Sequence, residues 1–168
     1  MRNHGWTLTE LLIAVGLAVV LAGLAVPTCA SLLADLRRSS ALTLVHGAFH
    51  TARRLAAAHG RPVLLCGLDA DGQCSGTLDW SGLALGVRMD LQYSPLQTWT
   101  MPPAPTGTGL RSNRPVIHFF PLPPAATPAT VIYCDPRGPN ATGAVILSSS
   151  GRPRVALGAE LAGAASCS

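Results

Sequence analysis

Residues 11–34 form an uninterrupted run of 24 uncharged, mostly apolar residues, and they follow the single acidic residue Glu10. As a helix this run would be roughly 36 Å long at about 1.5 Å per residue, which exceeds the roughly 30 Å hydrocarbon core of a bilayer. The pattern therefore predicts a helix long and apolar enough to cross a membrane.

After the uncharged run, apolar residues recur at roughly helical spacing, and most arginines lie off this stripe. The stripe consists of Leu36, Leu44, Val45, Phe49, Ala52, Leu55 and Ala56. Gly60 and Pro62 follow, and Gly and Pro commonly end helices. We expect the helix to continue to about His59 and to cover a sheet with this stripe.

Beyond residue 60 the pattern changes to short apolar runs separated by turns rich in Gly, Pro and Asp. Strands are predicted at residues 62–68, 114–120, 130–135, 144–150 and 154–157, with weaker candidates at 75–80, 84–93 and 96–101. Residues 101–109 and 121–129 are predicted to be Pro-rich loops. The fold class is therefore α+β, with one long N-terminal helix packed on an antiparallel β-sheet in a single small domain.

Three interpretations of the N-terminus compete. A secretory signal peptide would use Arg2, the apolar run and an exit near Ala30. A plain membrane anchor would let Glu10 reach back to the interface. Neither gives the carboxylate a role, although a charge near the start of a membrane helix costs a few kcal/mol or more unless it is paired.

The third interpretation is a resemblance. The segment GWTLTELLIAVGLAVVLAGLAVP resembles the class III signal of type IV pilins and type II secretion pseudopilins. The resemblance implies that a prepilin peptidase cuts after Gly5 and methylates Trp6, a position where the family usually has Phe. Glu10 then matches the family's glutamate, and Pro27 matches its mid-helix proline.

The resemblance also implies an organisation and a location. Residues 1–5 would be a leader peptide, residues 6–33 a transmembrane and polymerisation helix, and residues 34–168 a periplasmic domain of a single-pass inner-membrane protein. The implied partners are the prepilin peptidase, other pilin or pseudopilin subunits and inner-membrane lipid.

The physical chemistry of Glu10 and Pro27 is consistent with the roles that the resemblance implies. Cleavage would free an α-ammonium group close to Glu10, and in a low dielectric a paired charge is favoured over a lone one. Gly5, Trp6 and Glu10 are therefore the expected processing residues, and Trp6, Glu10 and Pro27 are the expected filament-docking residues. Pro27 lacks an N–H group and clashes with the preceding turn, so we expect it to bend the helix.

A second set of residues narrows the resemblance. A strand ending in Cys66, a DG turn, Cys74, then Trp80 with Gly82, and a closing SGRPR hairpin resemble the GspH/FimT branch of pseudopilins. The likeness is strongest at the N-terminus and moderate at residues 62–86 and 144–157.

The chain has five cysteines, and Cys29 lies in the apolar run. The other four would face the periplasm, where disulfides persist. We expect a bridge from Cys66 to Cys74 and another from Cys134 to Cys167, although four cysteines allow three pairings. A zinc site is the alternative, but no Cys-x-x-Cys spacing supports it.

No catalytic constellation is found, so we expect neither an enzyme nor a cofactor nor a metal site. His46 and His50 are four residues apart, but Gly47 stands where a zinc protease would have a glutamate. They are better explained as helix-surface histidines.

The net charge is +4, all twelve basic residues being arginines, which is weak support for an anionic partner. Some members of the FimT branch hold DNA with a Gly-Arg-x-Arg element, and Gly151, Arg152 and Arg154 match it. Arg forks suit phosphate oxygens. The alternative is a tight hairpin with two solvated arginines. Three further arginines would extend a basic patch if the fold brought them near: Arg111, Arg114 and Arg137.

The sequence thus predicts a minor pilin or pseudopilin, a structural subunit of a type II secretion pseudopilus or a type IV pilus. The first alternative is a DNA-binding minor pilin of natural transformation, and the second is a secreted soluble periplasmic protein.

Overall fold

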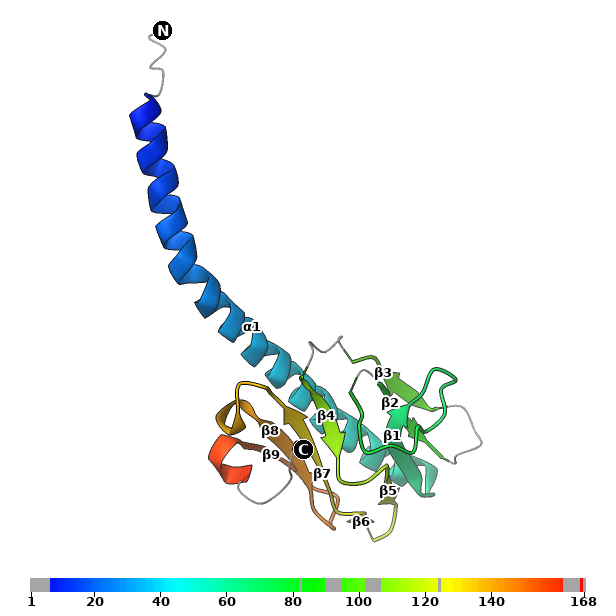
Figure 1. Ribbon diagram of the computed structural model, residues 1–168. Coiled ribbons are helices and arrows are strands. Elements are labelled where there is room, and N and C mark those ends of the chain that lie inside the picture. Colours follow the sequence, from blue (N-terminus) through cyan, green and yellow to red (C-terminus); the bar gives the residue numbers. More distant parts are fainter. Residues whose placement is uncertain are drawn as a thin grey trace. The chain divides into compact units, whose positions relative to one another are not determined.

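The structure, a computed structural model, describes residues 7–81, 83–89, 95–101, 107–123, 125–161 and 167, apart from the side chains at positions 24, 25, 27 and 159. The chain divides into two compact units, Met1–Arg37 and Arg38–Ser168. The long helix α1 (Leu8–His59) contributes to both units (Figure 1).

The predicted end of α1 at His59 is confirmed. Gly60 follows with φ +62°, a left-handed conformation that glycine adopts without a steric penalty and that ends many helices. The helix runs through position 27 without interruption, so Pro27 does not end it.

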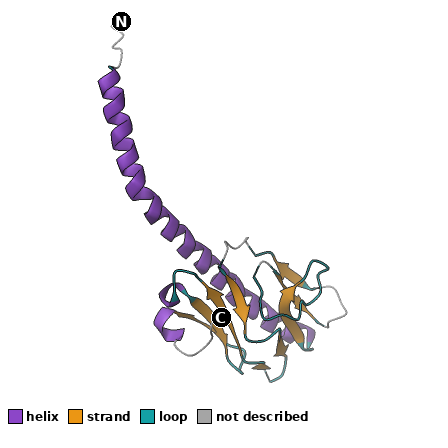
Figure 2. Cartoon of the chain, viewed as in Figure 1, coloured by secondary structure: helices purple, strands orange, loops and turns teal. Residues whose placement is uncertain are grey.

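The described residues of the second unit form two antiparallel sheets (Figures 1 and 2). The first has the order β3-β2-β1-β5-β6 and consists of β1 (Val63–Leu68), β2 (Ala84–Arg88), β3 (Gln97–Trp99), β5 (Val116–Phe120) and β6 (Ala125–Ala126). The second has the order β4-β7-β8-β9 and consists of β4 (Gly109–Ser112), β7 (Ala129–Cys134), β8 (Gly143–Leu147) and β9 (Pro153–Leu157). Two short 3-10 helices are η1 (Pro139–Ala141) and η2 (Gly158–Leu161).

The structure departs from the sequence-based expectation in three places. There are two sheets where one was expected. Strands β4 and β6 fall partly or wholly in stretches predicted as loops. Residues 75–80 form no strand and make a single bridge, from Asp79 to Arg111. The predicted positions 90–93 and 102–106 lie outside the described residues.

Both sheets pack on the second half of α1. The side chains of Val45, Phe49, Ala52 and Ala56 are completely buried there, and the ring centroid of Phe49 lies 6.0 Å from that of Phe119 on β5. The sheet residues facing the helix are Val63, Leu65, Leu85, Val87, Ile117 and Phe119 in the first sheet and Leu110, Val131, Tyr133, Val145 and Leu147 in the second.

The predicted helix stripe is confirmed in the second unit but not in the first. Leu44 and Leu55 are partly buried against the same core. Leu36 belongs to the first unit and is 56% exposed, so it is not part of the core that the stripe was expected to form.

The far face of the first sheet is closed by the loop after β1. A disulfide joins Cys66 of β1 to Cys74, as expected from the sequence. The guanidinium group of the completely buried Arg88 donates to the carbonyl oxygen of Gly72 and to the side-chain oxygen of Gln73 (3.1 Å). A buried cation is thus satisfied by the loop that covers it.

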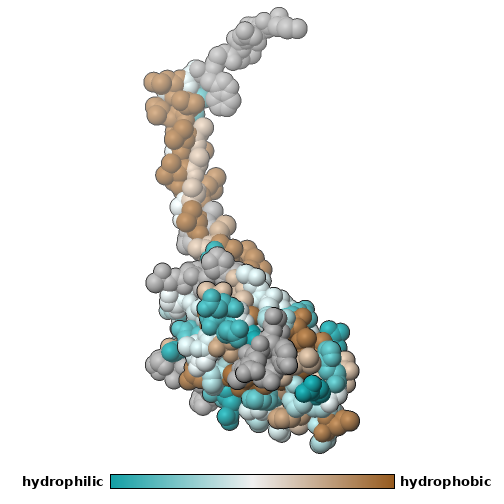
Figure 3. All heavy atoms as spheres, turned by 90° about the vertical axis from the view of Figure 1, so that its right-hand side faces the viewer, coloured by the Kyte–Doolittle hydropathy of each residue, from teal (hydrophilic) through white to brown (hydrophobic). Residues whose placement is uncertain are grey.

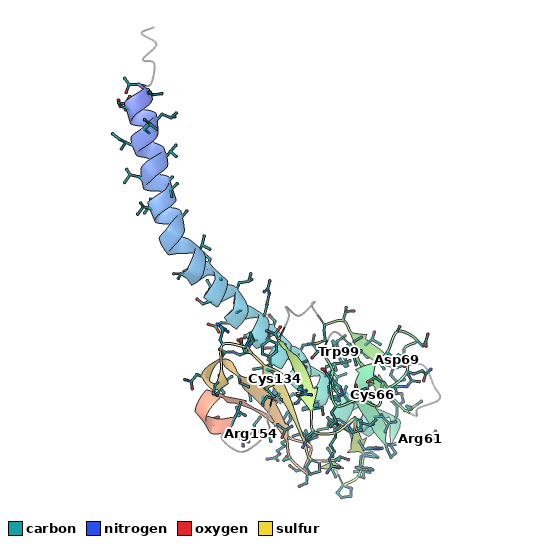
Figure 4. All side chains as sticks on the ribbon, in the orientation of Figure 1. Arg61, Cys66, Asp69, Trp99, Cys134 and Arg154 are labelled. Carbon is teal, nitrogen blue, oxygen red and sulfur yellow. A yellow bond between two sulfur atoms is a disulfide. The ribbon has the colours of Figure 1, made fainter. Side chains whose placement is uncertain are left out.

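The far face of the second sheet is covered in part by η2 and by Cys167. A disulfide joins Cys134 of β7 to Cys167, the second pair expected from the sequence, and Arg111 donates to the carbonyl oxygen of Cys167 (3.1 Å). A small second core forms on this face from Ile132, Cys134, Ala144, Ala156 and Leu161. Figure 4 labels Cys66 and Cys134, one on each sheet.

The turn after β7 is held by a buried carboxylate. The side chain of Asp135 is 2% exposed and accepts hydrogen bonds from the backbone N–H (2.9 Å), Nε (3.0 Å) and Nη2 (2.8 Å) of Arg137. The side-chain hydrogen bonds from Arg137 are the main reason that the pKa of Asp135 lies below its ordinary value of 3.8. The ionised form is therefore favoured by folding.

We predict that the Asp135–Arg137 pair stabilises the fold above about pH 4 and not in stronger acid. Because folding lowers the pKa, the contribution is complete above the unfolded-state pKa and is lost as pH falls through the folded-state pKa. Asp135→Asn should lower the free energy of unfolding by about 2 kcal/mol at neutral pH, with a smaller deficit at about pH 3. Urea unfolding of the detergent-solubilised chain measures this. The exposed Asp71→Asn is the control, and a deficit independent of pH would contradict the prediction.

Candidate functional site

The N-terminal end of α1 is organised by Thr7 and Glu10. Glu10 Oε2 accepts hydrogen bonds from the backbone N–H (3.1 Å) and the hydroxyl (3.2 Å) of Thr7, and the backbone N–H of Glu10 donates to Thr7 Oγ1 (3.3 Å). This reciprocal arrangement is a capping box, in which two otherwise unpaired backbone donors of the first turn are satisfied. The sequence analysis missed it, although the Thr-x-x-Glu spacing before an apolar run is its signal.

Glu10 therefore caps the helix in the single subunit. Its carboxylate is exposed and lies at the positive end of the helix dipole. Gly5 and Trp6 lie outside the described residues, so their predicted roles in cleavage and methylation rest on the sequence alone.

The first half of α1 is apolar around its whole circumference. Its most apolar stretch of 18 residues has a mean hydropathy of 2.5, and none of this stretch is buried within the chain. Figure 3 shows the apolar side chains gathered on this part of the helix, whereas more polar residues cover much of the second unit. The exposed large residues are Leu8, Leu11, Leu12, Ile13, Val15, Leu17, Val19, Val20, Leu21, Val26, Leu32, Leu33 and Leu36.

The length and the composition of this half of α1 are sufficient for it to cross a bilayer. Cys29 is a free, exposed cysteine within it. The side chain of Pro27 is outside the described residues, so the expected bend there stays a prediction.

The SGRPR segment forms the turn between β8 and β9. The backbone N–H of Gly151 donates to the carbonyl oxygen of Ser148 (2.9 Å), and the Ser148 hydroxyl lies 3.1 Å from the carbonyl oxygen of Arg152, to which it donates. The backbone N–H of Arg152 in turn donates to the Ser148 side chain (3.2 Å). Gly151 has φ +71°, so a residue with a side chain would be strained there.

The turn separates the two arginines of the motif. Arg152 lies in the turn and Arg154 lies on β9, and both side chains are exposed. Arg154 pairs in register with Ile146, which pairs with Thr130, so its side chain stands on the sheet face away from α1. Arg152 precedes β9, so the side-chain alternation of a strand applies to Arg154 alone.

The three arginines proposed to extend the patch have structural partners of their own. Arg137 forms an ion pair with Asp135, and Arg111 donates to the carbonyl oxygen of Cys167. Arg114 Nε donates to the carbonyl oxygen of Pro128 (3.2 Å). Arg111 is also three strands away from β9 in the sheet order.

His46 and His50 are neighbours on the helix surface, with ring centroids 4.7 Å apart. The pKa of His50 is lowered, first by partial burial and then by the positive charges of His46, Arg53 and Arg54. No group of three or more His, Cys, Asp and Glu side chains is placed to hold a metal ion within the described part of the chain. His118 on β5 is exposed and stacks on Phe120.

A groove of about 190 Å³ lies between the start of the second unit's helical segment and strand β9. Its lining residues are Arg38, Ser39, Leu42, Thr43, Val155 and Leu157. Gly143 of β8 permits the close approach of the groove residue Leu42, because a β-carbon at Gly143 would collide with it. The lining holds no acid–base pair or nucleophile suited to catalysis.

Comparisons with known proteins agree with the fold described above. The family described as "Type II transport protein GspH" matches residues 41–151, which are 111 of the 168 residues of the chain. A comparison with curated proteins finds no match.

Two crystal structures of the type IV minor pilin FimU from Pseudomonas aeruginosa strain PAO1 are similar in fold. The structure in space group P65 has a TM-score of 0.54 and 16% sequence identity, covering 70% of this chain and 91% of that one. The structure in space group P21 has a TM-score of 0.53 and 16% identity, covering 71% and 87%. At this identity the similarity shows a shared fold.

The expected α+β fold, a long helix packed on antiparallel sheets, is that of type IV pilins. The family match spans more than half of the chain, includes β1, and ends within the β8–β9 turn at Gly151. The chain therefore belongs to the GspH family, whose members are structural subunits of the pilin and pseudopilin type and not enzymes.

Proposed function

We propose that this protein is a minor pilin or pseudopilin that a prepilin peptidase cleaves between Gly5 and Trp6, with methylation of Trp6. Residues 6–33 anchor it in the inner membrane and residues 34–168 lie in the periplasm. The observation that carries the proposal is Glu10, an exposed carboxylate at the entrance of a helix that is apolar on all sides.

The role of Glu10 follows from the cost of a charge near lipid. Its only described partner is Thr7, which is neutral and leaves the negative charge uncompensated. Cleavage after Gly5 would place the α-ammonium group of Trp6 next to Thr7, within reach of this carboxylate or of one on a neighbouring subunit. In a low dielectric such a pair is favoured over either charge alone.

The partners follow from this arrangement. Membership of the family implies assembly with other pilin or pseudopilin subunits. The apolar first half of α1 then contacts lipid before assembly and the helices of neighbouring subunits afterwards. The two disulfides favour an oxidising compartment such as the periplasm for the second unit. The filament is that of a type II secretion system or a type IV pilus.

We predict that the charge of Glu10, and not its cap, controls entry into the filament. Glu10→Gln keeps an oxygen that can accept from Thr7 but removes the charge, whereas Glu10→Ala removes both. Both variants should still be cleaved, but co-purification with partner subunits should fall about tenfold or more, the effect of losing about 1.4 kcal/mol of pairing. Quantitative pull-down after cross-linking in cells measures this.

Thr7→Ala is the matched control, because it weakens the cap and keeps the charge. It should co-purify close to the wild-type level. Normal assembly of Glu10→Gln together with loss in Thr7→Ala would show that only the helix cap matters, and the docking role of the charge would be wrong.

DNA binding in natural transformation is the second candidate function. The observation that favours it is the β8–β9 turn, where a fixed backbone presents Arg152 in the turn and Arg154 on the strand that follows, both exposed. Neither side chain forms an ion pair with a carboxylate among the described residues. Guanidinium groups held on a rigid turn are suited to phosphate oxygens.

For this candidate we predict binding of duplex DNA that weakens as salt rises, because phosphate contacts release counterions. Arg152→Ala/Arg154→Ala should weaken binding to every sequence and reduce the slope of log K against log salt by about 2, one for each arginine. Fluorescence titration of the detergent-solubilised full chain measures both. A wild-type chain that binds no DNA even at low salt would reject this second candidate and leave the filament role unaffected.

A further inference from the structure

An arginine of α1 packs against the turn that carries the Gly-Arg-Pro-Arg motif. A β-carbon placed on Gly151 would lie 3.7 Å from Cδ of Arg53. Arg53 is half-buried and Gly151 is buried, so the aliphatic stem of this helix residue covers the first residue of the motif. The helix therefore brings a positive charge to the turn from nearly a hundred residues away in the sequence.

Further positive charge surrounds Arg53 on the helix. Arg54 is exposed and next to it, and His50 lies one turn earlier, three and four residues away. The pKa of His50 is lowered first by partial burial and then by the nearby positive charges of His46, Arg53 and Arg54. Repulsion of this kind is relieved when an anion binds.

No carboxylate compensates these charges within the described residues. Arg53, Arg54 and Arg152 take part in no ion pair among the described residues, whereas Arg137 is paired with Asp135. Hydrogen bonds to Ser148 fix the backbone at Arg152, and the packed core holds the helix through Ala52 and Ala56. The cations thus stand on rigid elements, which limits the entropy lost when a ligand binds.

We propose that Arg53 and Arg54 of α1 join Arg152 in one cationic surface that binds the phosphodiester backbone of duplex DNA. This inference rests on the second candidate function and assigns to α1 a part of the site that the sequence motif does not contain. We call these three residues the helix–turn surface.

The arginines of the helix–turn surface come from two separate elements, α1 and the β8–β9 turn, and this spacing favours an extended polyanion over a small ligand. The groove lined by Arg38 and Thr43 lies ten or more residues earlier on α1, and none of the three arginines lines it. Duplex DNA carries about one charge for each 1.7 Å of its axis, so a phosphate can face each of several spaced guanidinium groups. Because Arg154 stands on the opposite face of the sheet, Arg152 is the residue of the motif that continues towards the helix.

The test compares two double variants in the full chain, solubilised in a neutral detergent. Fluorescent duplex DNA is titrated at several salt concentrations against wild type, Arg53→Ala/Arg54→Ala and Arg152→Ala/Arg154→Ala. Arg37→Ala/Arg61→Ala removes the same charge from exposed positions outside the surface and is the matched control. Circular dichroism checks that each variant is folded, and Arg53→Lys/Arg54→Lys replaces any variant that is not.

The helix–turn surface predicts that Arg53→Ala/Arg54→Ala weakens binding and reduces the salt slope by about 2, while the control keeps the slope close to wild type. If this variant binds like wild type and Arg152→Ala/Arg154→Ala does not, the helix has no role and the inference is wrong, although DNA binding stands. If wild type binds no DNA, the second candidate function fails together with the inference. Binding to vesicles of anionic phospholipid but not to duplex DNA would also overturn it.

Discussion

The structure depends on the contact between one narrow stripe of α1 and two sheets. Val45, Ala52 and Ala56 are completely buried, and Phe49 packs near Phe119 of the first sheet. The alanines let both sheets approach the helix closely, and the buried apolar area supplies the main favourable free energy. Each sheet has a second face, and a disulfide is attached to a strand of each sheet: Cys66–Cys74 on the first and Cys134–Cys167 on the second.

The same helix follows a different rule in the first unit. There the apolar residues are exposed around the whole helix, which suits a surrounding of lipid or of other apolar helices and not a folded core. The single carboxylate at its start is then the residue whose charge needs a partner. In the proposed filament role, the first half of α1 serves assembly with lipid and neighbouring subunits, and the second half forms the core of the second unit with the two sheets.

Local patterns predicted most of the elements, and contacts between distant residues account for what was missed. The helix end at His59 and strands β1, β5, β7, β8 and β9 follow from apolar runs and turn residues. Strand β4, Gly109–Ser112, has little apolar character and exists because it pairs with β7. The division of the strands into two sheets also depends on which strands pair with one another, and local patterns do not determine this.

The candidate sites likewise combine residues that the sequence pattern indicates with contacts that only the tertiary structure creates. The motif at the β8–β9 turn and Glu10 are visible in the sequence, but the approach of Arg53 to Gly151 arises only when α1 packs beside the hairpin. The partners of Arg111, Arg114 and Arg137 likewise come from the tertiary structure.

Intact-mass spectrometry of the chain, expressed with and without a prepilin peptidase, tests the account most directly. The account predicts a chain beginning at singly methylated Trp6 with the peptidase and at Met1 without it. A chain beginning near Ser31 in both cases would contradict it and indicate a secreted soluble protein.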